Sequence, residues 1–182
     1  MHLNCHSHYS FKYGTLSVEQ LLQLAQKCEQ KVLALTDINN TSGCLSFVQQ
    51  AKEVGIKPIV GIDFRLGAQQ QFIGLAKNNG GFQALNQYLS QLLLAKASIP
   101  ARTAQLEEVF VIYPFSLYSK QCIELKDNEY MGIAYHELKA LSFSAWANHQ
   151  EQMVFLQTVT VSNRREYNVH RLLRAIDQNT LL

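Results

Sequence analysis

The stretch KVLALTDINNTSGCLSFVQQAKEVGIKPIVGIDF, residues 31–64, decides the fold class. Its first part, KVLALTD (31–37), is a short apolar run of the kind that forms a buried strand. TSGCLSFVQQAKEVG (41–55) predicts a helix that ends at Gly55, and IKPIVGIDF (56–64) predicts a second buried strand. A strand, a helix and a further strand in this order are typical of α/β folds.

The same alternation continues on both sides of this stretch. SVEQLLQLAQKC (17–28) carries apolar residues at helical spacing, and Ser17 with Gln20 forms a plausible capping box at its start. Further strands are expected at residues 70–76, 107–114, 129–135 and 152–161, interleaved with helical segments at 82–97, 117–123, 137–146 and 165–176. Seven alternations favour an α/β barrel or a doubly wound sheet.

Polar motifs at the ends of the predicted strands favour the barrel. NCHSH (4–8), LTDINN (35–40) and GIDF (61–64) all stand where a strand passes into a loop. In α/β barrels the functional residues gather at the C-terminal ends of several strands. We therefore expect a barrel whose site is built from these three motifs.

Composition limits the function classes. With 182 residues, 47% of them apolar, the chain can bury a substantial core. A net charge of +2 is too small for a domain whose whole surface binds the phosphates of nucleic acid. The four cysteines form no CxxC motif, and no apolar run approaches the roughly 20 residues of a membrane helix. We expect a reduced, cytoplasmic protein without a membrane partner.

Several stretches resemble the PHP (polymerase and histidinol phosphatase) domain, in the version at the N-terminus of bacterial DNA polymerase III alpha subunits. They are HLNCHSHYSFKYGTLSVEQLLQLA (2–25), ALTDINNTSG (34–43), AKEVGIKPIVGIDF (51–64), FIGLAKNNGGFQALNQYLS (72–90) and YNVHRLLRAID (167–177). The resemblance implies a distorted seven-stranded (β/α)7 PHP-type barrel. It also implies a single PHP-like domain over residues 1–182, as the N-terminal part of a longer polymerase chain.

The resemblance also implies a set of metal-ligand positions, most of which are changed here. Active PHP domains hold two or three metal ions through an HxH pair, further carboxylates and histidines, and a closing DxH. In this chain His6 and Asp63 remain, with Asp37 as a nearby helper. The lost ligand positions fall on Asn4, Tyr13, Ile38, Gln71, Thr158 and Thr160.

A paired-metal centre needs about eight nitrogen or oxygen donors. We therefore predict a vestigial metal site of His6, Asp37 and Asp63, with no catalytic residue and no resident cofactor. At most one divalent cation, Zn²⁺, Mn²⁺ or Mg²⁺, would bind there weakly.

Other residues have simpler interpretations. His8, His136, His149 and His170 are expected to be solvated or hydrogen-bonded structural residues, and Cys5 a small apolar residue packed under the first helix. NNGGF (78–82) reads as a turn into a helix, because it lacks the lysine and hydroxyl residue of a phosphate-binding loop. In the last helix, Arg164, Arg171 and Arg174 should share the solvated side, opposite a buried side of Val169, Leu172, Leu173 and Ile176.

The resemblance implies a role in DNA replication. The parent chain would be a DNA-directed DNA polymerase, a nucleotidyltransferase, and this domain a catalytically inactive structural and docking module. Its partners would be the polymerase domains of the same chain, a proofreading exonuclease subunit, and DNA through the parent polymerase. Two alternatives stay open: a stand-alone metal-dependent phosphoesterase of the PHP family with a reduced site, and a free-standing regulatory protein.

Overall fold

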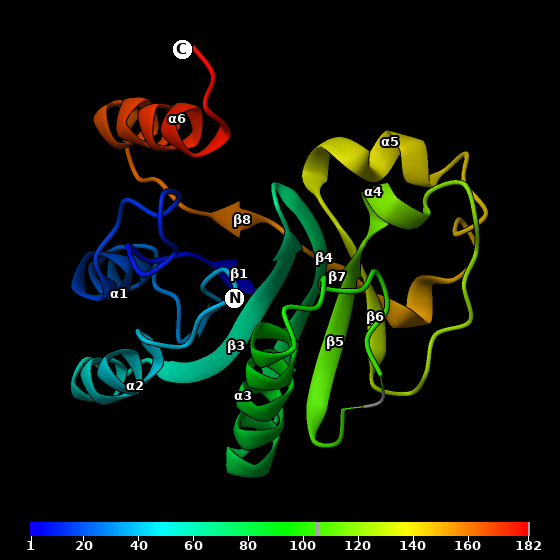
Figure 1. Cartoon of the computed structure of the whole chain (residues 1–182), viewed down its shortest axis with the longest axis horizontal. Coiled ribbons are helices and arrows are strands. Elements are labelled where there is room, and N and C mark those ends of the chain that lie inside the picture. Colours follow the sequence, from blue (N-terminus) through cyan, green and yellow to red (C-terminus); the bar gives the residue numbers. More distant parts are fainter. Residues whose placement is uncertain (105, 182) are drawn as a thin grey trace. The chain divides into compact units, whose positions relative to one another are not determined.

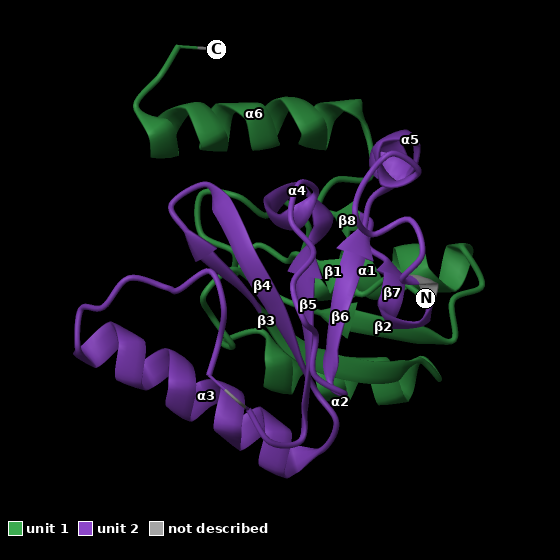
Figure 2. Cartoon of the chain, turned by 90° about the vertical axis from the view of Figure 1, so that its right-hand side faces the viewer, with its two compact units in different colours: residues 1–62, 158–182 green, residues 63–157 purple. Residues whose placement is uncertain are grey.

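The computed structural model describes residues 1–104 and 106–181, so Gln105 and Leu182 of the predicted domain lie outside the described residues. The chain divides into two compact units, shown in different colours in Figure 2. Unit 1 comprises Met1–Ile62 and Thr158–Leu182, and unit 2 comprises Asp63–Gln157. The first and last parts of the chain therefore fold together in unit 1.

Unit 1 combines short parallel strands with three helices (Figure 1). These elements are β1 (Asn4–Cys5), α1 (Val18–Lys27), β2 (Val32–Leu35), α2 (Cys44–Glu53), the first part of β3 (Lys57–Leu66), β8 (Thr158–Val159) and α6 (Arg164–Gln178). β1 pairs in parallel with β8, with Asn4 opposite Thr158. β2 pairs in parallel with β3, from Val32 opposite Lys57 onward. The strand, helix and strand predicted over residues 31–64 are all present.

Helix α1 begins where the sequence predicts. The Ser17 side chain accepts a hydrogen bond from the Gln20 N–H at 3.1 Å, and the Gln20 side chain accepts one from the Ser17 N–H at 2.8 Å. This reciprocal pair satisfies two amides that a helix start leaves without partners. Gly55, which has a φ of +72°, follows the end of α2, and this backbone conformation suits glycine.

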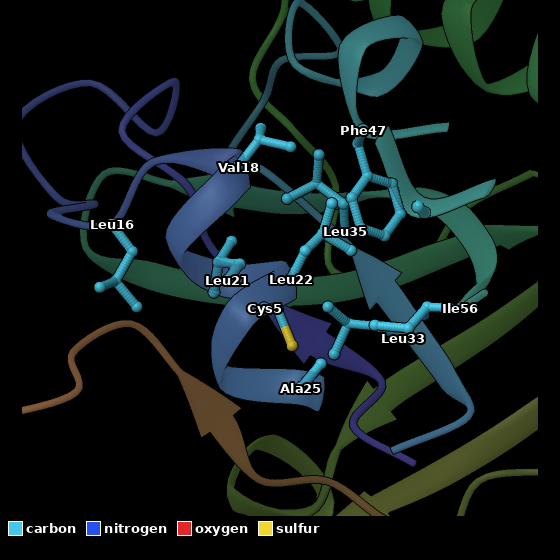
Figure 3. Packing of buried hydrophobic residues seen from close by; sticks show 11 residues of the cluster. Cys5, Leu16, Val18, Leu21, Leu22, Ala25, Leu33, Leu35, Phe47 and Ile56 are labelled. Atoms are coloured by element: carbon cyan, nitrogen blue, oxygen red, sulfur yellow. The ribbon is translucent and has the colours of Figure 1, made fainter. Parts of the chain in front are cut away.

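The apolar core of unit 1 lies against β1, β2, α1 and α2 (Figure 3). Cys5 belongs to it and is fully buried among Leu22, Ala25 and Leu33, as predicted. Burial, with a smaller contribution from the negative charge of Asp37, raises the pKa of the Cys5 thiol to about 12. The thiol is therefore neutral at physiological pH and serves as a packing residue.

Unit 2 contains one sheet with strand order β3-β4-β5-β6-β7 and a long helix that packs on β4 and β5. Its elements are the end of β3, β4 (Gln69–Ala76), α3 (Asn79–Leu94), β5 (Val109–Pro114), α4 (Phe115–Tyr118), β6 (Glu129–Ile133), η1 (Tyr135–Glu137), α5 (Leu138–Leu141), η2 (Gln150–Gln152) and β7 (Met153–Phe155). β4 and β5 are antiparallel, whereas β5, β6 and β7 are parallel. Phe64 stacks on Phe72 in the interior, with ring centroids 4.5 Å apart.

The α/β class is confirmed, but the seven-stranded (β/α)7 count is not. β3 and β4 follow each other without a helix, because the chain reverses at Gly67, where φ is +59°. The strand predicted over residues 152–161 is two strands: β7 pairs with β6, whereas β8 pairs with β1. The predicted single strand is therefore interrupted between Phe155 and Thr158.

Two predicted helices are much shorter than expected. α4 ends at Tyr118, whose carbonyl oxygen accepts a hydrogen bond from the Trp146 indole N–H at 2.8 Å and so is engaged outside the helix. α5 ends at Leu141, whose carbonyl oxygen accepts one from the Ser144 hydroxyl at 2.8 Å. Serine side chains that bond nearby backbone groups compete with helix continuation.

The predicted buried side of the last helix is wrong. Val169, Leu172 and Ile176 of α6 are 42%, 46% and 56% exposed. The helix contacts the rest of unit 1 through a different side, where His170 and Arg174 meet Tyr13. Polar and aromatic contacts, not apolar burial, therefore hold α6. Within the described residues, no helix has the length and apolar content needed to cross a membrane.

Candidate functional site

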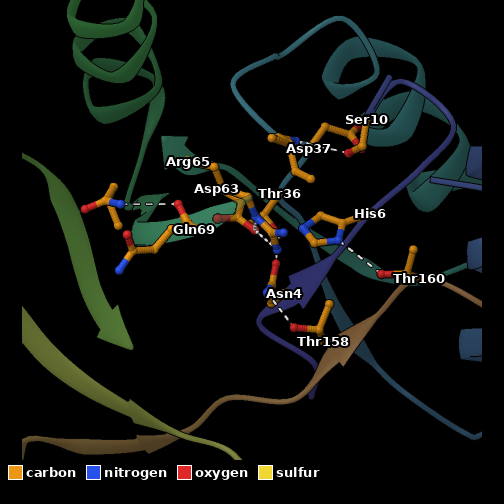
Figure 4. Close-up of polar contacts among 12 residues, drawn as sticks. Asn4, His6, Ser10, Thr36, Asp37, Asp63, Arg65, Gln69, Thr158 and Thr160 are labelled. Atoms are coloured by element: carbon orange, nitrogen blue, oxygen red, sulfur yellow. Dashed lines mark hydrogen bonds and ion pairs between the residues drawn. The ribbon is translucent and has the colours of Figure 1, made fainter. Parts of the chain in front are cut away.

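Asn4 is fully buried and lies at the centre of a hydrogen-bond network in unit 1 (Figure 4). Its side-chain oxygen accepts a hydrogen bond from the Thr36 hydroxyl at 2.9 Å, and its side-chain nitrogen donates one to the Thr158 hydroxyl at 2.9 Å. The pairing of β1 with β8 places Asn4 opposite Thr158. Two positions where the resemblance calls for metal ligands, Asn4 and Thr158, thus bond each other directly.

His6 is fully buried beside this network. Its Nδ1 atom lies 3.1 Å from the Thr160 hydroxyl, the second residue at the predicted closing DxH. The imidazole also meets the Tyr13 ring edge to face, with centroids 5.1 Å apart. His6 is therefore engaged by two side chains that both stand at ligand positions of the resemblance.

Tyr13 is the residue that connects α6 to the site. Its ring packs edge to face against His170, with centroids 4.6 Å apart, and the Arg174 guanidinium lies 5.1 Å from its centroid. His170 Nδ1 also lies 2.7 Å from the Tyr13 carbonyl oxygen. His170 is thus a hydrogen-bonded structural residue, whereas His8 is exposed. The aromatic side chain at this position, where the resemblance implies a metal ligand, anchors the last helix of unit 1.

Asp37 organises the loop that follows β1. Its two carboxylate oxygens accept hydrogen bonds from the Ser7 N–H at 2.7 Å, the Ser7 hydroxyl at 2.7 Å and the Ser10 hydroxyl at 2.6 Å. Ser10 in turn accepts a hydrogen bond from the Ile38 N–H at 3.0 Å, so Ile38, at a position where the resemblance implies a histidine, takes part through its backbone. The carboxylate is fully buried and balanced by three donors.

Asp63 lies in unit 2 and is paired with Arg65. Both the Nε and an Nη atom of Arg65 contact one carboxylate oxygen of Asp63, at 2.9 and 2.8 Å. Asp63 is fully buried and Arg65 is 9% exposed. Gln71, at another position where the resemblance implies a ligand, is also buried, and its side chain donates to the Gln69 carbonyl oxygen at 3.3 Å. An arginine thus supplies positive charge beside a carboxylate of the predicted site.

Sequence reasoning missed three of these partners: Ser7, Ser10 and Arg65. The pairing of Arg65 with Asp63 could have been predicted, because residues two apart on a strand point to the same face and Asp63-x-Arg65 has that spacing. For the two serines the indication in the sequence was weaker, since serine side chains often bond nearby backbone and carboxylate groups in loops. His6 and Asp37 of the predicted metal site lie in unit 1, and Asp63 lies in unit 2.

The donor set of unit 1 does not fit a paired-metal centre. An amide and threonine hydroxyls stand where imidazole and carboxylate ligands would be needed, and they bond one another. Asp37 receives three hydrogen bonds from serine residues. In the part of the chain that the structure describes, no group of three or more His, Cys, Asp or Glu side chains is arranged to hold a metal ion.

Unit 2 contains a second buried charged group, centred on Glu129. This carboxylate accepts a hydrogen bond from the Arg102 guanidinium at 2.7 Å and one from the Tyr113 hydroxyl at 3.1 Å. Burial and the negative charge of Glu129 raise the pKa of Tyr113 to about 12. Tyr113 is therefore a neutral hydrogen-bond donor over the physiological pH range.

Comparison with known proteins gives a consistent family. The family model of the PHP domain matches residues 2–181. The DNA polymerase III subunit alpha of Ureaplasma parvum is 35% identical over 96 residues, which are 53% of this chain and 10% of that protein. The corresponding subunit of Mycoplasma genitalium is 35% identical over 115 residues, which are 62% of this chain and 13% of that protein. The chain thus spans about a tenth of the length of these relatives.

Among solved structures, an amidohydrolase from Chromobacterium violaceum, with bound sulfate and no metal, superimposes with a TM-score of 0.53. The alignment covers 87% of each chain at 11% sequence identity, so it supports the α/β fold alone. The family model, by contrast, spans nearly all of the sequence. The chain belongs to the PHP domain family.

Proposed function

We propose that this PHP domain is the catalytically inactive N-terminal region of a bacterial DNA polymerase III alpha chain, acting as a structural and docking module. The proposal includes a cytoplasmic location, a parent chain with DNA-directed DNA polymerase activity, and contact with DNA only through that chain. It includes no resident cofactor, and at most one weakly bound divalent cation at His6, Asp37 or Asp63. The homology to the polymerase subunits supports the parent, and the polar network of unit 1 supports the inactivity.

The proposed inactivity is supported mainly by hydrogen bonds between residues at the ligand positions that the resemblance implies. Asn4 bridges Thr36 and Thr158, and His6 lies within hydrogen-bond distance of Thr160. A metal ion would have to displace these bonds, and besides the His6 imidazole it would gain only a neutral amide and hydroxyls, which are poor ligands for Zn²⁺ or Mn²⁺. Hydrolysis of a phosphoester by paired metals needs ions close enough to activate water and clamp the leaving oxygen.

The ion pair of unit 2 supports the same proposal. Asp63 is a carboxylate at a position where the resemblance implies a carboxylate ligand. Arg65, however, contacts it through two nitrogen atoms. A guanidinium satisfies a buried carboxylate with directional hydrogen bonds and cannot lose its proton in proteins. A divalent cation binding to Asp63 would have to compete with this fixed positive charge.

Metal content and turnover test the inactivity. The purified protein is incubated with Zn²⁺, Mn²⁺ or Mg²⁺, desalted and measured by elemental mass spectrometry, and hydrolysis of bis(p-nitrophenyl) phosphate is followed with and without EDTA. We expect fewer than two ions per chain and no chelator-sensitive turnover. The variant D37N/D63N is the matched control, because turnover that persists in it comes from a contaminant.

The opposite result would support the alternative, a metal-dependent phosphoesterase with a reduced site. Two or more bound ions, with turnover that EDTA abolishes and D37N/D63N lacks, would contradict the proposed inactivity. One ion without turnover would agree with the vestigial site. None of these results bears on docking, which needs its own experiment.

Docking is tested with the natural polymerase chain and the proofreading exonuclease subunit of the same source. If the proposal is correct, the full chain binds the exonuclease as a stoichiometric complex in size-exclusion chromatography with light scattering, and a chain that lacks residues 1–182 does not. Loss of the domain should also lower the melting temperature of the polymerase. Equal binding by both chains would refute the exonuclease as partner. A reading frame that stops after Leu182 would favour the free-standing regulatory protein.

A further inference from the structure

The four cysteines of the chain differ in exposure. Cys5 and Cys44 are buried, and burial raises the pKa of each thiol to about 12, so both stay protonated and inaccessible. Cys28 and Cys122 are exposed. The chain therefore has two thiols that solutes can reach, one in each unit, and their surroundings can be compared directly.

Cys122 has a histidine beside it. The distance between its Sγ atom and the Nε2 atom of His149 is 3.8 Å, within hydrogen-bond range for sulfur. An imidazole nitrogen at this distance can accept the thiol proton and leave a thiolate, which is the nucleophilic form of cysteine. Cys28 lies instead at the C-terminal end of α1.

The imidazole of His149 is held in place by a buried tryptophan. Its ring packs edge to face on Trp146, with centroids 5.6 Å apart, and the backbone N–H of His149 donates to the Trp146 carbonyl oxygen at 3.0 Å. Trp146 is 1% exposed, and its indole N–H donates to the Tyr118 carbonyl oxygen at 2.8 Å. Tyr118 lies four residues before Cys122, so the same indole also holds the segment that leads to Cys122.

A surface hollow of about 460 Å³ adjoins the imidazole. It is lined by Ala147, Asn148, His149, Glu151 and Gln152. Its volume lies in the range of ordinary small-molecule sites, and amide and carboxylate groups suit a polar, peptide-like molecule. The hollow thus offers space for the non-reacting part of a small thiol compound beside the Cys122–His149 pair.

We propose that Cys122, activated by His149, is a site of reversible thiol–disulfide exchange with low-molecular-weight disulfides of the glutathione class. His149 Nε2 takes the Cys122 proton, and the thiolate attacks one sulfur of the disulfide. The new bond joins Cys122 Sγ to that sulfur, and the old sulfur–sulfur bond breaks. The departing thiolate takes the proton from the imidazolium, so the products are a mixed disulfide on Cys122 and one free thiol.

The test measures how fast oxidised glutathione modifies each cysteine at about neutral pH, by mass spectrometry of peptides from samples quenched over time. Cys122 is expected to react about tenfold or more faster than Cys28, and dithiothreitol should reverse the modification. In His149→Phe, which keeps a ring beside Trp146 but removes the nitrogen, the Cys122 rate should fall to about that of Cys28. The Cys28 rate should not change.

The buried cysteines report folding in the same experiment. Cys5 and Cys44 should stay unmodified in a folded protein. If they become modified in His149→Phe, that variant has unfolded, and the measurement is repeated with His149→Gln. Equal rates for Cys122 and Cys28 in the unsubstituted protein would overturn the proposal. So would a folded His149 variant in which Cys122 reacts as fast as before.

Discussion

Units 1 and 2 balance their buried polar groups in different ways. In unit 1, the network around Asn4 and His6 consists of an amide, an imidazole and threonine hydroxyls, and the buried carboxylate of Asp37 is held by serine donors. In unit 2, Asp63 and Glu129 are each paired with an arginine. One unit uses hydrogen bonds between small side chains, and the other uses full positive charges.

This difference has energetic consequences. A neutral hydrogen bond contributes about 0.5–1.5 kcal/mol, so a network of such bonds tolerates the loss of one partner. A buried ion pair does not, because removal of one partner leaves a charge without compensation in a medium of low polarity. Single substitutions should therefore cost more in unit 2 than in unit 1, and four predictions test this ranking.

The largest effect is expected for Arg65→Met. It removes the two nitrogen atoms that contact Asp63 and leaves a fully buried carboxylate without its guanidinium. We expect a loss of about 3–5 kcal/mol in the free energy of unfolding, measured by urea denaturation. The double variant D63L/R65M removes both charges and should recover most of that loss. A single variant as stable as the unsubstituted protein would show that the pair is not important.

The next effect is expected for Asp37→Asn. The substitution keeps the shape of the side chain but replaces one acceptor oxygen with a donor, which then faces hydroxyl and amide donors of Ser7 and Ser10. Since hydrogen bonds to charged groups are worth about 1.5–3 kcal/mol, we expect a loss of about 3 kcal/mol. Hydrogen exchange should accelerate in residues 7–10 first. A larger loss than for Arg65→Met would reverse the ranking of the two units.

Alkaline pH tests the Glu129 group of unit 2. Because the pKa of Tyr113 is raised from 10.0 to about 12, the folded protein keeps its phenol proton at a pH where the unfolded chain has lost it. Stability from this group is therefore complete below pH 10 and falls as the pH rises toward 12, by about 2 kcal/mol. Tyr113→Phe should show a shallower decline in urea denaturation between pH 9 and 11. Cys5 and Cys44 also lower the stability at alkaline pH, but equally in the unsubstituted protein and in Tyr113→Phe. If stability fell equally steeply with pH in the two proteins, the assignment of this pH dependence to Tyr113 would be wrong.

The smallest effect is expected for Thr158→Val. Valine keeps the shape of threonine but removes the hydroxyl that accepts from the Asn4 side chain at 2.9 Å. The cost should be about 1 kcal/mol, since one neutral hydrogen bond is lost and the Asn4 oxygen keeps its bond to Thr36. Thermal unfolding at neutral pH measures it. A cost above 3 kcal/mol would show that the unit 1 network is as sensitive as the ion pair of unit 2.

Features encoded within a few residues were predictable. The capping box of α1, the helix end before Gly55 and the burial of Cys5 all follow from local spacing. The division of residues 152–161 into β7 and β8 was not predictable, because their partners β6 and β1 are set by pairing over distance. The contact side of α6 was also missed, because polar and aromatic partners replaced the apolar face that its periodicity indicated.

The candidate site shows the same division. The sequence alone predicted which ligand positions of the family pattern are changed, because Asn4, Tyr13 and Thr158 can each be compared with a motif. Only the tertiary structure decided what the changed residues do, since Asn4 and Thr158 lie 154 residues apart along the chain and meet through the pairing of β1 with β8. Residue type sets what a side chain can bond, whereas the path of the backbone sets which partner is within the 3 Å that such a bond requires.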